Sequence, residues 1–178
     1  MTHQYRGSDP MWEPAPRPHG SNYTGENLVW SLQLDIQRGA LSGNTTLVAK
    51  AFARMWGSIV LACQPGDGLM ADGSFHQHGP LLQSGAYGSA FMLDILAFVQ
   101  LSAGTGFAIP DTPLGVFVHY LVEGQANMIR VGAGVAYPAW MIPPRGREIS
   151  RPGNGNASDA GDIADGIVRH FPAQFPPF

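Results

Sequence analysis

The sequence predicts a mainly α-helical fold in which successive helix pairs form an array joined by long irregular connections. Apolar side chains recur at the three- and four-residue spacing of helices in one segment after another. Short apolar strands do not alternate with helices, which argues against a sheet built from βαβ units. With 23 glycines and 15 prolines among 178 residues, the connections are expected to carry many of the functional side chains.

The first two helices follow a proline-marked segment, residues 1–23, which is expected to be extended and poorly ordered. Thr24 is suited to capping a helix over 26–41, which carries an apolar stripe and ends just before Gly43. The same spacing predicts a second helix over 45–62. These two segments would form the first helix pair of the array.

A glycine-rich loop over 64–85 separates this pair from the later elements. The third helix, over 87–103, is apolar almost all round, which is typical of a helix buried between others. The later elements are a helix over 110–124, a short strand over 127–131, a basic loop over 143–155, a last helix over 157–170 and a proline-rich tail over 171–178. Residues 24–170 therefore form the predicted domain.

The composition excludes several classes of protein. A net charge of −3 argues against a general binder of nucleic acid or anionic membranes, which would need a basic excess. The most apolar window, 90–103, is too short to span a bilayer. The single cysteine, Cys63, excludes an internal disulfide, and the apolar run before it favours a buried, inert thiol. No signal peptide is recognised at the N-terminus.

A histidine and a tyrosine lie nine residues apart in the glycine-rich region. His78 ends the run Asp-Gly-Ser-Phe-His-Gln-His, and Tyr87 lies in Gly-Ala-Tyr-Gly. Both side chains can transfer protons, and glycines allow close approach of a ligand. Asn27 lies in the first turn of the first helix, where backbone N–H groups favour a carboxylate. A helix cap and a core aromatic are the plainer interpretations of Asn27 and Tyr87.

Two further groups of residues have alternative interpretations. His76 and His78 would face the same side of an extended strand, as in a metal-binding His-x-His pair, but no acidic ligand follows nearby. A metal site is therefore not expected. Arg147 and Arg151 are four residues apart and would clamp an acidic ligand, or they are solvated arginines of a loop.

Several motifs follow one another in order: Thr24-Gly25-Glu26-Asn27, Gly66-Asp67-Gly68, Asp72-Gly73-Ser74-Phe75 with Gln77-His78, Gly85-Ala86-Tyr87-Gly88, Gly106-Phe107-Ala108-Ile109-Pro110, and Gly146-Arg147 with Ile149-Ser150-Arg151. Together they resemble polysaccharide lyase family 8, which contains the hyaluronate, chondroitin AC and xanthan lyases. The resemblance covers about residues 24–170 and includes the separation of nine between the histidine and the tyrosine.

The resemblance implies β-elimination from a polysaccharide that contains uronic acid, with no cofactor. Asn27 and His78 would neutralise the uronate carboxylate, so that the charge developing after loss of the C5 proton is stabilised. Tyr87 would remove that proton and return one to the glycosidic oxygen at C4, or the histidine would be the base. The matching catalytic positions are Asn27, His78, Tyr87, Arg147 and Arg151, and Gln77 and Arg145 are expected to bind substrate.

The resemblance also implies an incomplete α/α toroid, because only the later part of the family's toroid is present and its β domains are absent. His76 stands where an apolar residue is more usual. Two hypotheses follow: a lyase or its catalytic segment, or a truncated, non-catalytic member that at most binds an acidic polysaccharide of the hyaluronan, chondroitin or xanthan type. An incomplete toroid would expose apolar helix faces, so self-association is expected. The substrate class implies an extracellular or periplasmic location.

Overall fold

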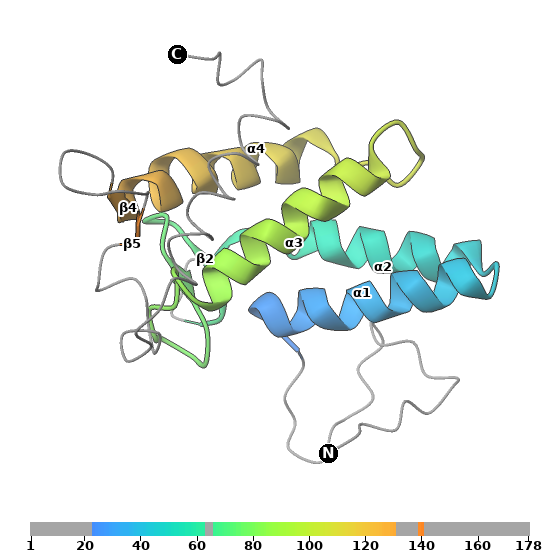
Figure 1. Cartoon of the computed structure of the whole chain (residues 1–178), viewed down its shortest axis with the longest axis horizontal. Helices are drawn as coiled ribbons and strands as arrows, with labels where there is room; N and C mark the ends of the chain where they lie inside the picture. Colours follow the sequence, from blue (N-terminus) through green and yellow to red (C-terminus); the bar gives the residue numbers. More distant parts are fainter. Residues whose placement is uncertain (1–22, 63–65, 131–138, 141–178) are drawn as a thin grey trace.

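The computed structural model describes residues 23–62, 66–130 and 139–140, and its fold is mainly helical, as predicted. Two long helices lie side by side and run in opposite directions, a third crosses them, and a fourth runs along the upper edge of the view (Figure 1). These helices are α1 (Gly25–Leu41), α2 (Thr45–Gly57), α3 (Tyr87–Ser102) and α4 (Asp111–His119).

The turn between α1 and α2 is built by two residues at the junction of the helices. Gly43 has a φ of +66°, a left-handed conformation that glycine adopts without steric cost and that ends α1. Asn44 then caps α2, because its side-chain oxygen accepts a hydrogen bond from the backbone N–H of Leu47 at 3.0 Å. This tight turn makes the two helices an antiparallel pair.

The core lies where α1, α2 and α3 meet. Fully buried aliphatic side chains from each helix pack there, at the spacing from which the helices were predicted. An aromatic group extends this core toward the end of α4, with Phe75 and Tyr120 contacting Phe91. The buried helix residues include Val29, Leu32, Met55, Met92 and Ile95.

A small sheet replaces part of the predicted second helix and of the glycine-rich loop. The prediction that α2 continues to residue 62 was wrong, because the helix ends at Gly57. Strand β1 (Leu61–Ala62) pairs in parallel with β2 (Gly68–Met70), which pairs antiparallel with β3 (Phe75–His76). Strands this short leave no periodic pattern, and the partners that stabilise them lie elsewhere in the chain.

The fourth predicted helix reaches its expected end but changes its geometry on the way. After α4 the chain winds more widely, as a π-helix over Tyr120–Gln125, and then more tightly, as a 3₁₀ turn over Ala126–Met128. The short strand expected over 127–131 is smaller: β4 (Ile129–Arg130) pairs antiparallel with β5 (Ala139–Trp140). Widened turns of this kind are frequent at functional sites.

Several predictions fall outside the described residues. They concern the N-terminal lead up to residue 22, Cys63, the basic loop over 143–155, the helix over 157–170 and the tail over 171–178. Among the helices that the structure describes, none combines the length and the apolar character needed to cross a membrane.

Candidate active site

The structure brings His78 and Tyr87 into direct contact. The Nε2 atom of His78 lies 3.0 Å from the phenol oxygen of Tyr87, within hydrogen-bond distance. The two rings are nearly perpendicular, at 87°, and their centroids are 5.1 Å apart. His78 is exposed and Tyr87 is half-buried at the first turn of α3. This is the pair that was predicted from the sequence, and its geometry allows a proton to pass between the two side chains.

The backbone at His78 turns the imidazole out of the strand that precedes it. His78 has a φ of +62°, a left-handed conformation that non-glycine residues rarely adopt, and Gly79 follows at +81°. The extended geometry assumed for a His-x-His pair is therefore not present. His76 instead lies with its Nε2 atom 3.1 Å from the hydroxyl of Ser74. Within the described ranges, no three His, Cys, Asp or Glu side chains form a group suited to a metal ion.

Asn27 lies in the first turn of α1, as predicted, on the side of the helix that approaches Tyr87. Trp30, three residues later and hence on the same helix face, contacts the Tyr87 ring with centroids 6.0 Å apart. The indole of Trp30 is 44% exposed, so part of its surface is open beside the histidine–tyrosine pair. An imidazole, a phenol and an indole are thus gathered where α1 and α3 begin, and Asn27 lies one helical turn before the indole.

Asp67 holds the loop that carries His78 against the start of α1. One of its carboxylate oxygens accepts hydrogen bonds from the hydroxyl of Thr24 at 2.7 Å and from the amide of Gln77 at 2.6 Å. The other accepts from the backbone N–H of Gly79 at 2.7 Å. The prediction that Thr24 caps α1 through its side chain was wrong, because the hydroxyl is bonded to Asp67.

Gln77 connects the same loop to α1 from the buried side. Its side-chain oxygen accepts from the backbone N–H of Glu26 at 3.0 Å, and its amide nitrogen donates to Asp67 and to the carbonyl of Thr24. The side chain has no exposed surface. The structure therefore gives Gln77 a positioning role, in place of the substrate contact expected from the sequence. Gly25 leaves room for this amide, since a β-carbon there would collide with its oxygen.

Asp67 is the site residue that sequence reasoning did not select. Its only signal was the Gly66-Asp67-Gly68 motif, which entered the family resemblance but suggested no role. The partners of Asp67 are 10, 12 and 43 residues away in the chain. Local spacing does not reveal contacts of that kind, because they depend on how the loop folds back on α1.

A second acidic residue shapes the hairpin between β2 and β3. Asp72 accepts hydrogen bonds from the hydroxyl of Ser74 at 2.6 Å and from its backbone N–H at 3.0 Å. These bonds hold the pKa of Asp72 below its ordinary value. The series Asp72, Ser74, His76 differs from a hydrolase triad, in which the histidine lies between the other two groups. We assign it to the turn.

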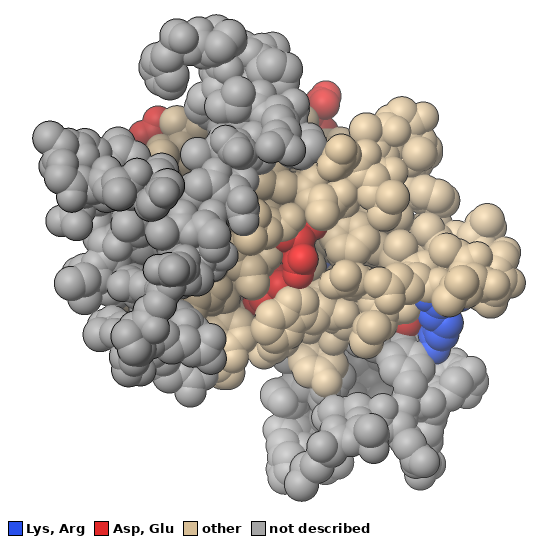
Figure 2. All heavy atoms as spheres, in the orientation of Figure 1, with Lys and Arg blue, Asp and Glu red and all other residues tan. Residues whose placement is uncertain are grey.

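The three arginines predicted to assist catalysis or bind substrate, Arg145, Arg147 and Arg151, lie outside the described residues. On the face shown in Figure 2, basic atoms of the described part appear at one end only, whereas acidic atoms appear in the middle, along the upper part and beside the basic atoms.

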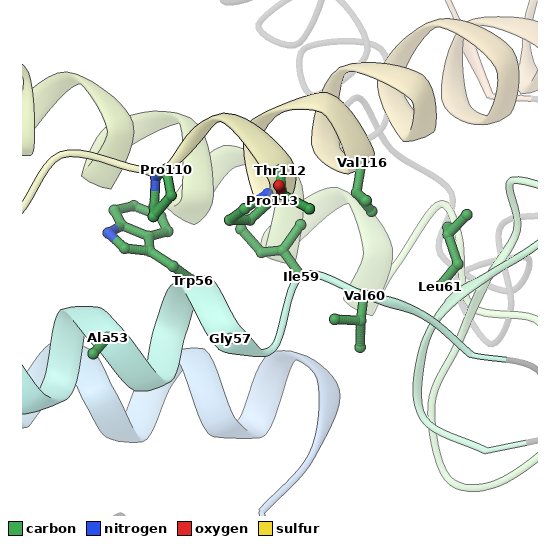
Figure 3. Close-up of a pocket in the computed structure, with 10 residues that line it drawn as sticks. All are labelled: Ala53, Trp56, Gly57, Ile59, Val60, Leu61, Pro110, Thr112, Pro113 and Val116. Carbon is green, nitrogen blue, oxygen red and sulfur yellow. The ribbon is translucent and has the colours of Figure 1, made fainter.

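An apolar pocket lies between α2 and α4 (Figure 3). Its lining includes Trp56, Ile59, Pro110, Pro113 and Val116, and Thr112 is the one polar side chain that faces it. No titratable group of the described residues lines this pocket. It has the character of a packing surface, and the proton-transferring groups lie elsewhere.

Comparison with known proteins adds an independent observation. The family model for the N-terminal α-helical domain of polysaccharide lyase family 8 matches residues 2–174. Xanthan lyase from Bacillus sp. (strain GL1) is 28% identical over 155 residues, which cover 86% of this chain and 16% of that protein. Hyaluronate lyase from Thermasporomyces composti is 32% identical over 88 residues, which cover 49% of this chain and 11% of that protein.

The fold is also similar to a solved structure. Xanthan lyase from Paenibacillus superposes with a TM-score of 0.71 at 26% sequence identity, covering 87% of this chain and 14% of that one. The chain thus spans about one sixth of the length of the xanthan lyase that it matches in sequence.

Proposed function

Because the chain belongs to polysaccharide lyase family 8, we propose that it carries the catalytic group of a lyase that cleaves a uronic-acid-containing polysaccharide by β-elimination. The observation that carries the proposal is the 3.0 Å contact between His78 Nε2 and the Tyr87 hydroxyl. Asn27 lies in the first turn of the neighbouring helix, three residues before Trp30, which contacts the Tyr87 ring. Amide, imidazole and phenol are the groups that such a reaction needs.

The reaction balances without a cofactor. The base takes the C5 proton of the uronate, the electron pair left behind forms a double bond between C4 and C5, and the bond from C4 to the glycosidic oxygen breaks. The departing oxygen takes a proton, so the products are an unsaturated uronate and a free hydroxyl. The carboxylate next to C5 would receive a hydrogen bond from Asn27, because neutralising its charge stabilises the enolate-like transition state.

The hydrogen bond between His78 and Tyr87 supports proton transfer at either end. If His78 accepts the phenolic proton, Tyr87 is the phenolate that attacks the C5 proton; if His78 is itself the base, the phenol is placed to protonate the departing oxygen. The indole of Trp30 offers a flat apolar surface beside this pair, on which a sugar ring would pack. Arg147, Arg151 and Arg145 are proposed to hold the acidic substrate.

The substrate proposed is an acidic polysaccharide of the xanthan, hyaluronan or chondroitin type, because matched relatives are named for these polymers. A polymeric substrate places the enzyme outside the cytoplasm, in an extracellular or periplasmic location. Binding of an acidic glycan without turnover is the second candidate. The exposed indole of Trp30 beside the histidine–tyrosine pair supports it, because a sugar ring packs on an open aromatic face.

We expect the purified chain to produce unsaturated uronate, detected by ultraviolet absorbance, from at least one of xanthan, hyaluronan and chondroitin. Tyr87→Phe removes only the hydroxyl and should lower the rate by at least about 100-fold, as loss of a proton-transfer group does. The matched control is Tyr23→Phe, which removes a hydroxyl from a residue outside the proposed catalytic group.

Two results would contradict the lyase proposal. One is a rate unchanged by Tyr87→Phe, which would place the chemistry elsewhere. The other is folded protein that binds one of these polymers without producing unsaturated uronate, which would establish the binding role.

A further inference from the structure

A buried acidic side chain immediately precedes Asn27 in α1. Glu26 has no exposed surface. Its backbone N–H donates a hydrogen bond to the side chain of Gln77. Neither of its carboxyl oxygens has an N–H or hydroxyl partner among the described residues. An ionised carboxylate buried without donors is strongly disfavoured, so this side chain requires a proton or a compensating partner.

The group that faces Glu26 is a second carboxyl, that of Asp94 on α3. Two carboxyl groups form a hydrogen bond with each other only when one of them carries a proton. Burial, followed by this hydrogen bond and the charge of Asp94, raises the pKa of Glu26 to about 10.

A buried tyrosine, Tyr120, lies near Glu26. Tyr120, in the π-helix, donates its hydroxyl to the carbonyl of Gly88 at 3.4 Å and accepts from the amide of Gln125. Burial and the proximity of Glu26 raise the pKa of Tyr120, so the phenol stays neutral. Among the described residues, Asp94 is the titratable group that acts on the Glu26 carboxyl, and Glu26 acts in turn on Tyr120.

The two carboxyl groups connect the helices that carry the proposed catalytic group. Glu26 is adjacent to Asn27 on α1, and Asp94 lies seven residues, or about two turns, beyond Tyr87 on α3. Residues seven apart share a helix face, so Asp94 and Tyr87 both lie on the side of α3 that approaches α1. A bond between Glu26 and Asp94 therefore limits how far Asn27 can move from Tyr87.

We propose that Glu26 and Asp94 share one proton, and that this bridge between α1 and α3 makes Glu26 a positioning residue for Asn27 and Tyr87. The catalytic part of this inference rests on the proposed lyase function, whereas the shared proton does not. Glu26 touches no substrate in this scheme and acts through the helix that it fixes.

The test compares Glu26→Gln, whose amide donates to Asp94 without titrating, with Glu26→Leu, which has a similar size and no donor. Glu123→Gln is the matched control, because Glu123 is an exposed acid on the π-helix. Three measurements apply to each variant: the infrared C=O stretch of a protonated carboxylic acid at pH 7, urea unfolding between pH 5 and 9, and the kcat and KM of uronate release.

The wild type and the control should show the protonated carboxyl band and lose stability as the pH rises, and Glu26→Gln should lose both properties. Glu26→Gln should keep kcat within about twofold, whereas Glu26→Leu should lower it by about tenfold or more with KM little changed, because misplaced groups slow chemistry more than binding. A missing band in the wild type, or equal kcat values for the two variants, would overturn the proposal.

The measurements also separate this inference from the proposed function. One possible result is that neither the wild type nor any variant releases uronate, while Glu26→Gln loses the infrared band and the pH dependence of stability. That result would establish the shared proton and contradict the lyase proposal. If uronate is released but the band is absent, the lyase proposal stands and the shared proton does not.

Discussion

At the scale of single residues, the site depends on an aspartate that contacts neither catalytic ring. Asp67 ties the backbone next to His78 to Thr24 and Gln77 through three hydrogen bonds. Charge-assisted bonds of this kind are stronger than neutral ones, and they fix the loop at the point where His78 leaves the strand. The position of the imidazole is therefore set by a residue eleven positions earlier in the chain.

Asp67→Ala should reduce both stability and activity. It leaves the buried amide of Gln77 without its 2.6 Å partner, which costs on the order of 1–3 kcal/mol. The freed loop should also lower the rate of uronate release by about tenfold or more, since small displacements of reacting groups are costly. Asp111→Ala, at an exposed acid of α4, should change the free energy of unfolding by less than about 1 kcal/mol. Equal effects of the two substitutions in urea unfolding would contradict this role for Asp67.

At the scale of elements, two glycines hold the β2–β3 hairpin against the π-helix. A β-carbon on Gly73 would lie 2.6 Å from the α-carbon of Gly124, which is backbone and unable to move aside. Gly73 also has a φ of +79°. The close approach therefore requires glycine for two separate reasons, steric room and backbone conformation.

Gly73→Ala should lower the free energy of unfolding by about 3 kcal/mol or more, because strain and overpacking add at this position. Gly57→Ala is the matched control, since no atom lies within 4 Å of its added β-carbon and it ends α2 on the surface. That substitution should be neutral or stabilising by up to about 1 kcal/mol. Chemical denaturation of both variants gives the comparison, and a Gly73→Ala protein as stable as Gly57→Ala would exclude the proposed contact.

The elements also show what local sequence can predict. Helices α1 and α3 were predicted to within a residue or two, because long apolar periods and Gly43 mark their extent. The end of α2 and the three-stranded sheet were not predicted. Two-residue strands have no period, and residues after Gly57 continue an apolar run that a buried helix would show as well.

For the candidate site, side-chain chemistry was easier to predict than the contacts that hold it. His78, Tyr87 and Asn27 were selected from residue type, loop context and the order of the motifs, and the structure brings the first two within hydrogen-bond distance. The roles of Asp67, Gln77 and Glu26 depend on loops and helices that meet only after folding. Such roles leave no signal in the spacing of neighbouring residues.

At the scale of the whole molecule, buried and hydrogen-bonded acids set how stability depends on pH. The pKa of Glu26 is raised from 4.5 to about 10, so the folded chain binds a proton that the unfolded chain lacks between these values. Its contribution to stability is full below pH 4.5 and is lost as the pH rises toward 10. The contribution of Asp72 to stability changes with pH in the opposite direction. Its pKa is lowered in the folded chain, so its contribution is lost as the pH falls.

We therefore expect the free energy of unfolding to be highest in mildly acidic solution. The Glu26 contribution should have decreased by about 3 kcal/mol between pH 4.5 and pH 7, at about 1.4 kcal/mol per pH unit. Urea unfolding at a series of pH values measures this slope. Stability that rises steadily from pH 5 to pH 9 would show that Glu26 is ionised in the folded chain.

The left-handed backbone of His78 has a consequence for any attempt to improve this protein. Its φ of +62° is a conformation that glycine and asparagine adopt at lower cost. A selection that rewards heat resistance alone would thus favour Gly or Asn at position 78, and the winning variants would have no imidazole beside Tyr87. Thermal stability and catalytic activity therefore place opposite demands on this position. A library of stabilising variants should keep His78 unchanged and vary the surface around it.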